Sequence, residues 1–328
     1  MRRRQCIALL GSAPIWPLAA RGQQSGAKCR LGLLLALTES DAQAREYVAA
    51  FVQALREHGW AEGTNVQIDY RWAGIDADNI RHAARELVDL KPDVLVAQSA
   101  LTLAPLRQLT SDIPIVFLQV IDPVGSGLVS SLARPGCNLT GVTLAEFPAI
   151  AEMLEVLKEV APKVNRVAVI YNPVQAPQVG MWRAIEVAAP ALSVRASPFS
   201  ASNADEISKA VTGFAGEPDG GVVVLPNPIT IANRALIISL MEQYRLPAVY
   251  QFTYFVREGG LVSYGTDPIT QYRQAASYVD QILKGAKSAD LPVQLATKFQ
   301  IAINLKTAKA LGLTISRDFL LVADEVIE

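Results

Sequence analysis

The sequence predicts an α/β protein built as two doubly wound parallel-sheet lobes, and two patterns in the chain predict it. Short apolar runs typical of buried strands alternate with longer amphipathic stretches along nearly the whole chain. Such alternation favours parallel sheets with right-handed crossovers and helices on both faces. The second half then repeats the order of the first, and 328 residues are enough for two separate cores.

The first half shows the alternation element by element. Residues 31–37 form an apolar run typical of a buried strand, and apolar residues within 41–58 recur at helical spacing until Gly59. Residues 66–72 alternate between apolar and polar, which predicts a strand buried on one side. The pattern predicts further strands at 94–98 and 114–119, with a helix over 79–90 before them.

Four segments of the first half have counterparts in the second half, in the same order. A repeated order of this kind indicates two similar lobes. No long Pro-, Gly- or Ser-rich linker separates the halves, so we expect short crossings near 141–143 and 264–266 that form a hinge. The matching segments are 30–33 with 166–169, 91–93 with 217–219, 113–117 with 246–250, and 134–141 with 257–265.

The N-terminus is typical of a secretory signal peptide over residues 1–22. Arginines at positions 2–4 precede a modest apolar stretch at 7–20, after which the chain turns polar. The Arg3-Arg4 pair and the weakly apolar middle favour the twin-arginine route, although the usual aromatic residue after the pair is missing. The sequence predicts export and leaves the route and the cleavage site open.

Removal of this segment takes away four arginines and no acidic residue, which leaves a net charge of about −5. That charge gives no reason to expect nucleic acid or an anionic membrane as a partner. Cys29 and Cys137 would remain, without metal-binding or framework spacing. We interpret them as packed thiols, with a disulfide between them as the alternative.

Sequence patterns of catalysis are absent. The two histidines, His58 and His82, both fall on predicted helices. The chain has no zinc-protease motif, nucleophile elbow, P-loop or dinucleotide-binding glycine motif. We therefore expect a binding protein without catalytic residues, metal or cofactor, and not an enzyme.

A set of motifs runs essentially from one end of the chain to the other, and the C-terminal ones are the most specific. They are Tyr70-Arg71-Trp72-Ala73, Asp122-Pro123-Val124, Asn138-Leu139-Thr140-Gly141-Val142, Ser263-Tyr264-Gly265-Thr266, and the tail segments 290–293, 297–299, 303–313 and 323–327. Together they resemble the tryptophan-binding-protein-like family of ABC transporter substrate-binding proteins. Cys137 departs from the pattern, since a second glycine is usual there.

The resemblance implies the type I periplasmic-binding fold, in which the chain crosses between the lobes three times. Lobe one would comprise residues 28–142 and 267–295, and lobe two residues 143–266 and 296–328. The resemblance also implies a periplasmic protein that captures a small-molecule ligand for an ABC permease in the inner membrane. We expect this protein to be monomeric.

Two such lobes form a cleft lined by the loops at the carboxyl ends of their strands. Helix N-termini, polar side chains and aromatic rings in those loops could hold a ligand. In lobe one the candidates are Glu39, Gln98, Ser99, Thr102, Gln119 and Asp122; in lobe two they are Tyr171, Asn172, Asn227, Tyr250 and Gln251, with Tyr264 and Asp267 at a crossing.

The leading candidate ligand is an amino acid with an aromatic or branched side chain. Small and hydroxyl residues at 99–102, opening a helix, suit a carboxylate, and Glu39, Asp122 or Asp267 could hold an amino group. Asp122 and Asp267 also precede prolines, so each could simply cap a helix. A purine, a sugar or an aromatic acid stays open as the ligand.

Two other functions stay open at this point. The same clamp could be a periplasmic sensor subunit that reports to a membrane signalling protein. A two-lobed α/β enzyme that works with carboxylates alone is the further alternative.

Overall fold

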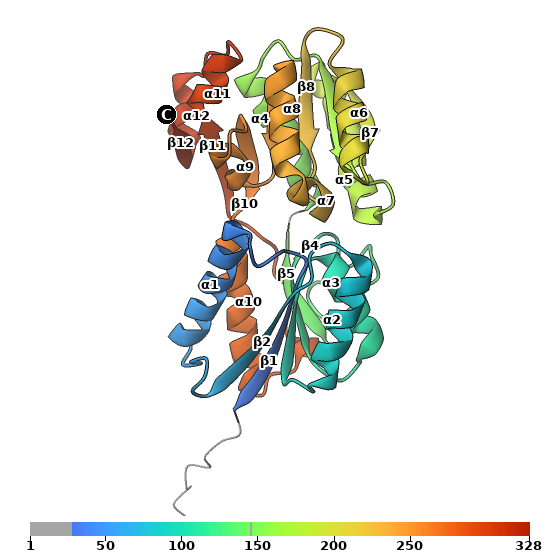
Figure 1. Cartoon of the computed structure of the whole chain (residues 1–328), viewed down its shortest axis with the longest axis vertical. Helices are drawn as coiled ribbons and strands as arrows, with labels where there is room; N and C mark the ends of the chain where they lie inside the picture. The colour runs from blue at the N-terminus through green and yellow to red at the C-terminus, as the bar shows by residue number, and fades with distance from the viewer. Residues whose placement is uncertain (1–27, 145) are drawn as a thin grey trace, which may run out of the picture.

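The computed structural model describes residues 28–144 and 146–328, which form two α/β lobes (Figure 1). The signal peptide predicted at residues 1–22 lies outside the described residues. Among the described residues, no helix is both long and apolar enough to cross a bilayer. The predicted fold class, two lobes built on parallel sheets and joined by three crossings, is confirmed by the order of the strands in the two sheets.

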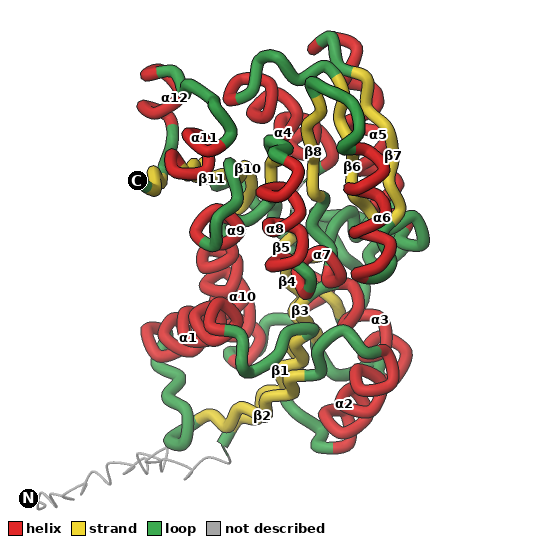
Figure 2. The backbone as a smooth tube through the Cα atoms, turned by 45° about the horizontal axis from the view of Figure 1, so that its top comes forward, coloured by secondary structure: helices red, strands yellow, loops and turns green. Residues whose placement is uncertain are grey.

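Lobe one is built on a parallel sheet with the strand order β2-β1-β3-β4-β5. Helices α1 and α10 cover one face of this sheet, and α2 and α3 cover the other. Figure 2 shows α1 and α10 side by side, although they come from opposite ends of the chain. The elements are β1 (Cys29–Leu35), α1 (Ala42–Glu57), β2 (Val66–Trp72), α2 (Ala77–Asp89), β3 (Val94–Gln98), α3 (Ala100–Leu109), β4 (Ile115–Val120), β5 (Leu139–Thr143) and α10 (Pro268–Leu283).

Helix α1 forms where the sequence supplies an apolar face, a cap and a stop. Tyr47, Val48 and Phe51 are buried on its inner face. The Asp41 carboxylate accepts a hydrogen bond from the backbone N–H of Gln43 at 3.0 Å and so caps the N-terminus. Gly59, at a φ of +94°, ends the helix in a conformation that other residues adopt at a cost.

Lobe two contains a sheet with the order β12-β11-β10-β9-β8-β6-β7. Neighbouring strands are parallel except β10 and β11, because the chain enters β11 from lobe one at the edge where β10 ends. Helices α4, α5, α11 and α12 cover one face, and α6, α8 and α9 cover the other. The elements are α4 (Phe147–Val160), β6 (Arg166–Tyr171), α5 (Ala176–Ala188), η1 (Ala189–Leu192), β7 (Arg195–Ser200), α6 (Ala204–Phe214), β8 (Gly220–Val224), α7 (Pro228–Ala232), α8 (Arg234–Tyr244), β9 (Ala248–Tyr250), α9 (Thr253–Arg257), β10 (Val262–Thr266), β11 (Phe299–Asn304), α11 (Leu305–Ala310), α12 (Arg317–Val322) and β12 (Glu325–Ile327).

The chain crosses between the lobes after β5, after β10, and between η2 (Ser288–Asp290) and β11. Hydrogen bonds join these crossings to one another. The backbone of Gln294 donates to Gly141 O and accepts from Thr143 N, each at 2.9 Å. The Thr266 hydroxyl donates to Leu144 O at 2.9 Å, which ties the second crossing to the first. The three crossings therefore form one hinge.

A glycine on the second crossing permits close packing of the hinge. A Cβ atom built on Gly265 would lie 2.0 Å from the backbone carbonyl oxygen of Gln251, which cannot move as a flexible side chain could. We predict that Gly265→Ala lowers the free energy of unfolding by about 3 kcal/mol, measured by urea denaturation. The matched control is Gly213→Ala in α6, where the new methyl group meets nothing within 4 Å. This control should gain about 0.5–1 kcal/mol, and an equal loss in both variants would contradict the interpretation.

Candidate functional site

A cavity of about 320 Å³ lies between the two lobes, within the size range of small-molecule sites. Its wall is mainly apolar and includes residues of both lobes. The largest apolar side chains in the wall are Leu101, Ile121, Leu128, Leu144, Ile231 and Phe252; the polar ones belong to Gln98, Ser99, Gln119, Ser126, Gln175, Gln178 and Asn227. This arrangement suits a small molecule with an apolar body and a few hydrogen-bonding groups.

Lobe one contributes the junction between β3 and α3. Ser99 is the N-cap of α3 and has φ +80° and ψ +163°, a conformation that is close to exclusive to glycine. Its hydroxyl oxygen is buried and has no hydrogen-bond partner among the described residues. No side chain caps α3, so its first backbone N–H groups lie beside the cavity without a side-chain acceptor.

A hydrogen-bond relay orients the amides in lobe one. The backbone N–H of Ala36 donates to Oε1 of Gln98 at 3.1 Å, and Nε2 of Gln98 donates to Oε1 of Gln119 at 2.7 Å. Gln119 itself has φ +57°, in the left-handed region. The relay therefore places the Gln119 amide at the cavity wall in a fixed orientation.

Lobe two contributes the N-termini of α5 and α7. Asn227 caps α7, since its Oδ1 accepts from the N–H groups of Ile229 and Thr230 at 2.9 and 3.0 Å. Gln178, in the first turns of α5, donates to the carbonyl of Pro226 at 2.9 Å and is buried. These bonds tie α5 to the loop before α7, so the lobe-two wall is a packed surface.

Of the residues that the sequence proposed for a ligand, Gln98, Ser99, Gln119 and Asn227 line the cavity. Asn172 lies just behind its wall, with its backbone N–H 3.4 Å from Oε1 of Gln178. Thr102 is fully buried beneath Ser99, and its hydroxyl donates to the carbonyls of Gln98 and Ser99. Thr102 therefore supports the loop from below.

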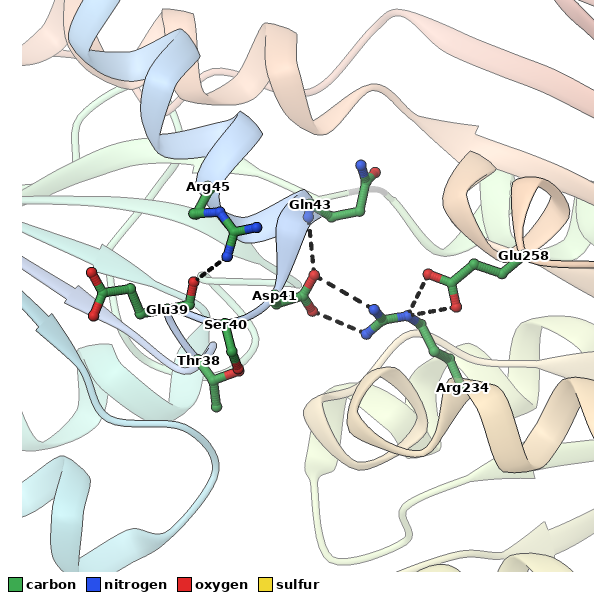
Figure 3. A network of polar contacts seen from close by, with 8 residues as sticks. All are labelled: Thr38, Glu39, Ser40, Asp41, Gln43, Arg45, Arg234 and Glu258. Carbon is green, nitrogen blue, oxygen red and sulfur yellow. Dashed lines mark hydrogen bonds and ion pairs between the residues drawn. The ribbon is translucent and has the colours of Figure 1, made fainter.

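The proposed carboxylates do not line the cavity. Glu39 is exposed, and its backbone carbonyl accepts a hydrogen bond from Arg45 (Figure 3). Asp267 caps α10 as its position before proline predicts. Asp122 lines two neighbouring cavities, and its carboxylate accepts from Gly125 N at 2.8 Å. The helix expected to start at Asp122 is instead a series of turns.

The proposed aromatic residues pack within lobe two. Tyr171 lies against Trp182, with ring centroids 6.3 Å apart. Tyr250 stacks on Phe255 inside the core, where burial raises the pKa of its hydroxyl. The buried amide of Gln251 has no partner among the described residues and does not line the cavity.

Tyr264 sits at the second crossing and lies outside the cavity wall. Its ring stacks on that of Phe299 at 5.3 Å, and its hydroxyl donates to the Glu152 carboxylate. Burial and this carboxylate raise the pKa of Tyr264.

The sequence analysis missed three polar residues of the wall, Ser126, Gln175 and Gln178, and its apolar residues, among them Phe252. Gln175 and Gln178 flank Pro177 at the start of α5, after β6. A proline in the first turn of a helix marks this junction in the sequence, and that signal could have located both glutamines. Phe252 directly follows Gln251, one residue beyond the proposed pair.

An ion pair connects the two lobes (Figure 3). The Arg234 guanidinium, at the start of α8 in lobe two, lies 3.0 Å from the Asp41 carboxylate in lobe one. It also contacts Glu258 at 2.8 Å. The Asp41 and Arg234 side chains are only 14% and 22% exposed, so water screens this pair only in part. The lobes are therefore held together by a contact between charges as well as by the hinge.

The described residues contain no group of three or more His, Cys, Asp or Glu side chains placed to hold a metal ion. Cys29 and Cys137 are free thiols.

A sequence model of the ABC transporter substrate binding protein family matches residues 34–327, nearly the whole chain. The chain belongs to this family. The resemblance expected from the motifs is thus confirmed.

Three relatives illustrate the similarity. A protein of Clostridioides difficile (strain R20291) named tyrosine-binding protein is 28% identical over 264 residues, which cover 80% of this chain and 75% of the relative. The crystal structure of a conserved domain protein from Vibrio cholerae matches with a TM-score of 0.84 at 28% identity, over 92% of this chain and 100% of that one. An ABC domain from Streptococcus pneumoniae in complex with L-Trp matches with 0.85 at 25% identity and the same coverage.

The strained conformation of Ser99 gives a stability prediction for this substrate-binding protein. Ser99→Gly should raise the free energy of unfolding by about 1 kcal/mol, because relief of the backbone strain exceeds the entropic cost of glycine. Ser99→Ala keeps the Cβ and should show no such gain. Urea denaturation of both variants checks this, and a Gly variant no more stable than the Ala variant would refute the strain.

Proposed function

We propose that this protein is the exported, periplasmic solute-binding component of an ABC importer, a monomer that delivers a small molecule to an inner-membrane permease. Its membership of the substrate-binding family and the predicted signal peptide at residues 1–22 support this. The observation that carries the proposal is the cavity walled by both lobes beside a three-crossing hinge. Such a site captures and releases a solute without chemical turnover.

The ligand we propose carries a carboxylate and an apolar body. The carboxylate would accept hydrogen bonds from the Ser99 hydroxyl and the first N–H groups of α3. The body would contact the wall formed by side chains such as Ile231 and Phe252. Aromatic and branched amino acids have both parts, and the names of two relatives, which mention tyrosine and L-Trp, support that class.

Closure of the lobes would be coupled to capture. A ligand that touches both walls makes more contacts when the lobes are together, so it shifts the population toward the closed state. The Asp41–Arg234 pair joins residues of different lobes, and we propose that it adds to the contacts that favour the closed state. We therefore propose a clamp whose closed form is stabilised jointly by ligand and ion pair.

The proposal predicts a ligand-dependent gain in stability and compactness. The protein from residue 23 onward would be screened by thermal unfolding against amino acids, aromatic acids, nucleosides and sugars. A ligand at one hundred times its dissociation constant should stabilise the fold by roughly 2.7 kcal/mol. Solution scattering with the same compound should show a smaller radius of gyration. A bound compound that is chemically converted, or that leaves the radius unchanged, would count against a transport clamp.

The ion pair predicts a separate effect on affinity. Asp41→Asn keeps the helix cap, because asparagine caps as well as aspartate, but it removes the charge that faces Arg234. Loss of this partly buried pair should weaken ligand binding roughly fivefold, about 1 kcal/mol. Calorimetric titration measures the change. Glu325→Gln is the control, since it removes an ion pair with Arg257 inside lobe two and should leave affinity as it is.

A further inference from the structure

The wall of the cavity between the lobes carries polar groups but no charge. None of the described side chains that line it belongs to Asp, Glu, Lys or Arg. Its seven polar side chains are amides and hydroxyls. The selectivity of this site must therefore come from the direction in which those amides and hydroxyls present hydrogens or lone pairs.

The orientation of the lobe-one amides follows from one backbone group. The N–H of Ala36 can only donate, so the atom of Gln98 that it meets at 3.1 Å must be the oxygen. The nitrogen of Gln98 is then the donor toward Gln119, at 2.7 Å, and meets the oxygen of that amide. The NH₂ group of Gln119 is then the part of this amide left to face the cavity, and no described residue accepts a hydrogen bond from it. Gln119 therefore offers the cavity a donor.

The lobe-two amide is oriented by the same logic. The N–H groups of Ile229 and Thr230 occupy the oxygen of Asn227. Among the described residues its NH₂ group has two partners, Oε1 of Gln178 and the carbonyl of Leu225, both at a long 3.4 Å. A ligand acceptor at normal distance would be a better partner, so Asn227 also presents a donor.

Two further donors lie at the lobe-one wall. The Ser99 residue is 8% exposed, and its buried hydroxyl has no partner among the described residues. The ten-residue helix α3 starts at this point without a side-chain cap. The positive end of its dipole and its first N–H groups favour an anion.

We propose that the cleft selects an apolar carboxylic acid that lacks an α-ammonium group, such as an arylalkanoate or a branched alkanoate, over the corresponding amino acid. The inference rests on the proposed function: it keeps the carboxylate and the apolar body of the proposed ligand but departs from its amino-acid members. The donors of Ser99, Gln119 and Asn227 match carboxylate oxygens. An ammonium group would enter the same space without a carboxylate to pair with, and an unpaired buried cation is costly.

Asp122 is the residue that could rescue an ammonium group. It lines two other cavities, one of which adjoins the main cavity and shares Ser126 and Pro177 with it. Its carboxylate already accepts from Gly125 N, which holds it in the turn. Substitution of Asp122 therefore tests whether this carboxylate pairs with an ammonium group in the cleft.

The experiment compares compounds that differ only in the ammonium group. Calorimetric titration would use L-tryptophan against 3-(indol-3-yl)propanoate and L-leucine against 4-methylpentanoate. We expect the acid of at least one pair to bind about tenfold tighter or more than its amino acid, a difference of about 1.4 kcal/mol. Tighter binding of the amino acid in both pairs overturns the inference. If Asp122→Asn then abolished that tighter binding, the Asp122 carboxylate would be identified as the partner of the ammonium group.

A single substitution should invert the preference. Gln119→Glu keeps an oxygen for Gln98 and replaces only the outward NH₂ with a second oxygen. We expect this variant to lose affinity for the acid and to gain it for the amino acid. The control is Gln243→Glu, which adds the same charge at an exposed position of α8. An unchanged preference in Gln119→Glu would refute the role of this donor.

Failure of the inference is distinct from failure of the proposed function. If neither member of either pair binds, the ligand class is wrong. The proposed closure of the lobes is tested separately: it requires that some compound of the wider panel reduces the radius of gyration. A preference for the amino acid with normal closure likewise refutes the inference alone.

Discussion

Hydrogen bonds between the three crossing segments determine how the two lobes meet. Gln294 bridges Gly141 and Thr143 on the first crossing, and Thr266 on the second donates to Leu144. The Gln271 amide, at the start of α10, donates to the Thr266 hydroxyl at 2.9 Å and reinforces the junction. The carboxyl edges of both parallel sheets lie at this junction, so the loops that follow their strands must face one another. The cavity and the ion pair both follow from that constraint.

Strain is concentrated on one side of the cleft. Ser99, Gln119 and Asp122 all have positive φ angles although none is glycine, and all three follow or end strands of lobe one. Such conformations persist only where the surroundings over-determine them. Here the fixed backbone of β3 and β4 and the relay from Ala36 do so. Lobe one therefore presents its polar groups in a set geometry before any ligand arrives, which limits the entropy lost on binding.

The fold could be predicted from sequence because strand and helix periods are local properties, and because the halves repeat one order. Gln98, Ser99, Gln119 and Asn227 could be placed at the cleft by the rule that loops after parallel strands share an edge. Tyr250 and Gln251 obey the same rule yet do not line the cavity, since Tyr250 stacks on Phe255 of α9 and Gln251 is buried against Gly265. The direction in which a side chain points depends on packing partners that are distant in the sequence, so a local pattern does not predict it. Gln178 lines the cavity from the first turns of α5. The rule about loops that follow strands does not cover residues inside a helix, so it could not place Gln178.

The position of α10 has a consequence for synthesis of the chain. This helix supplies Tyr272, Ala275 and Val279 to the core of lobe one, yet it follows almost all of lobe two. The last strands of the lobe-two sheet, β11 and β12, come later still. A nascent chain that has reached residue 266 thus has one lobe with a sheet face covered by α1 alone and another whose sheet lacks its last two strands. Lobe one can complete its core only after α10 has emerged and lobe two only after β12, so both lobes mature late in synthesis.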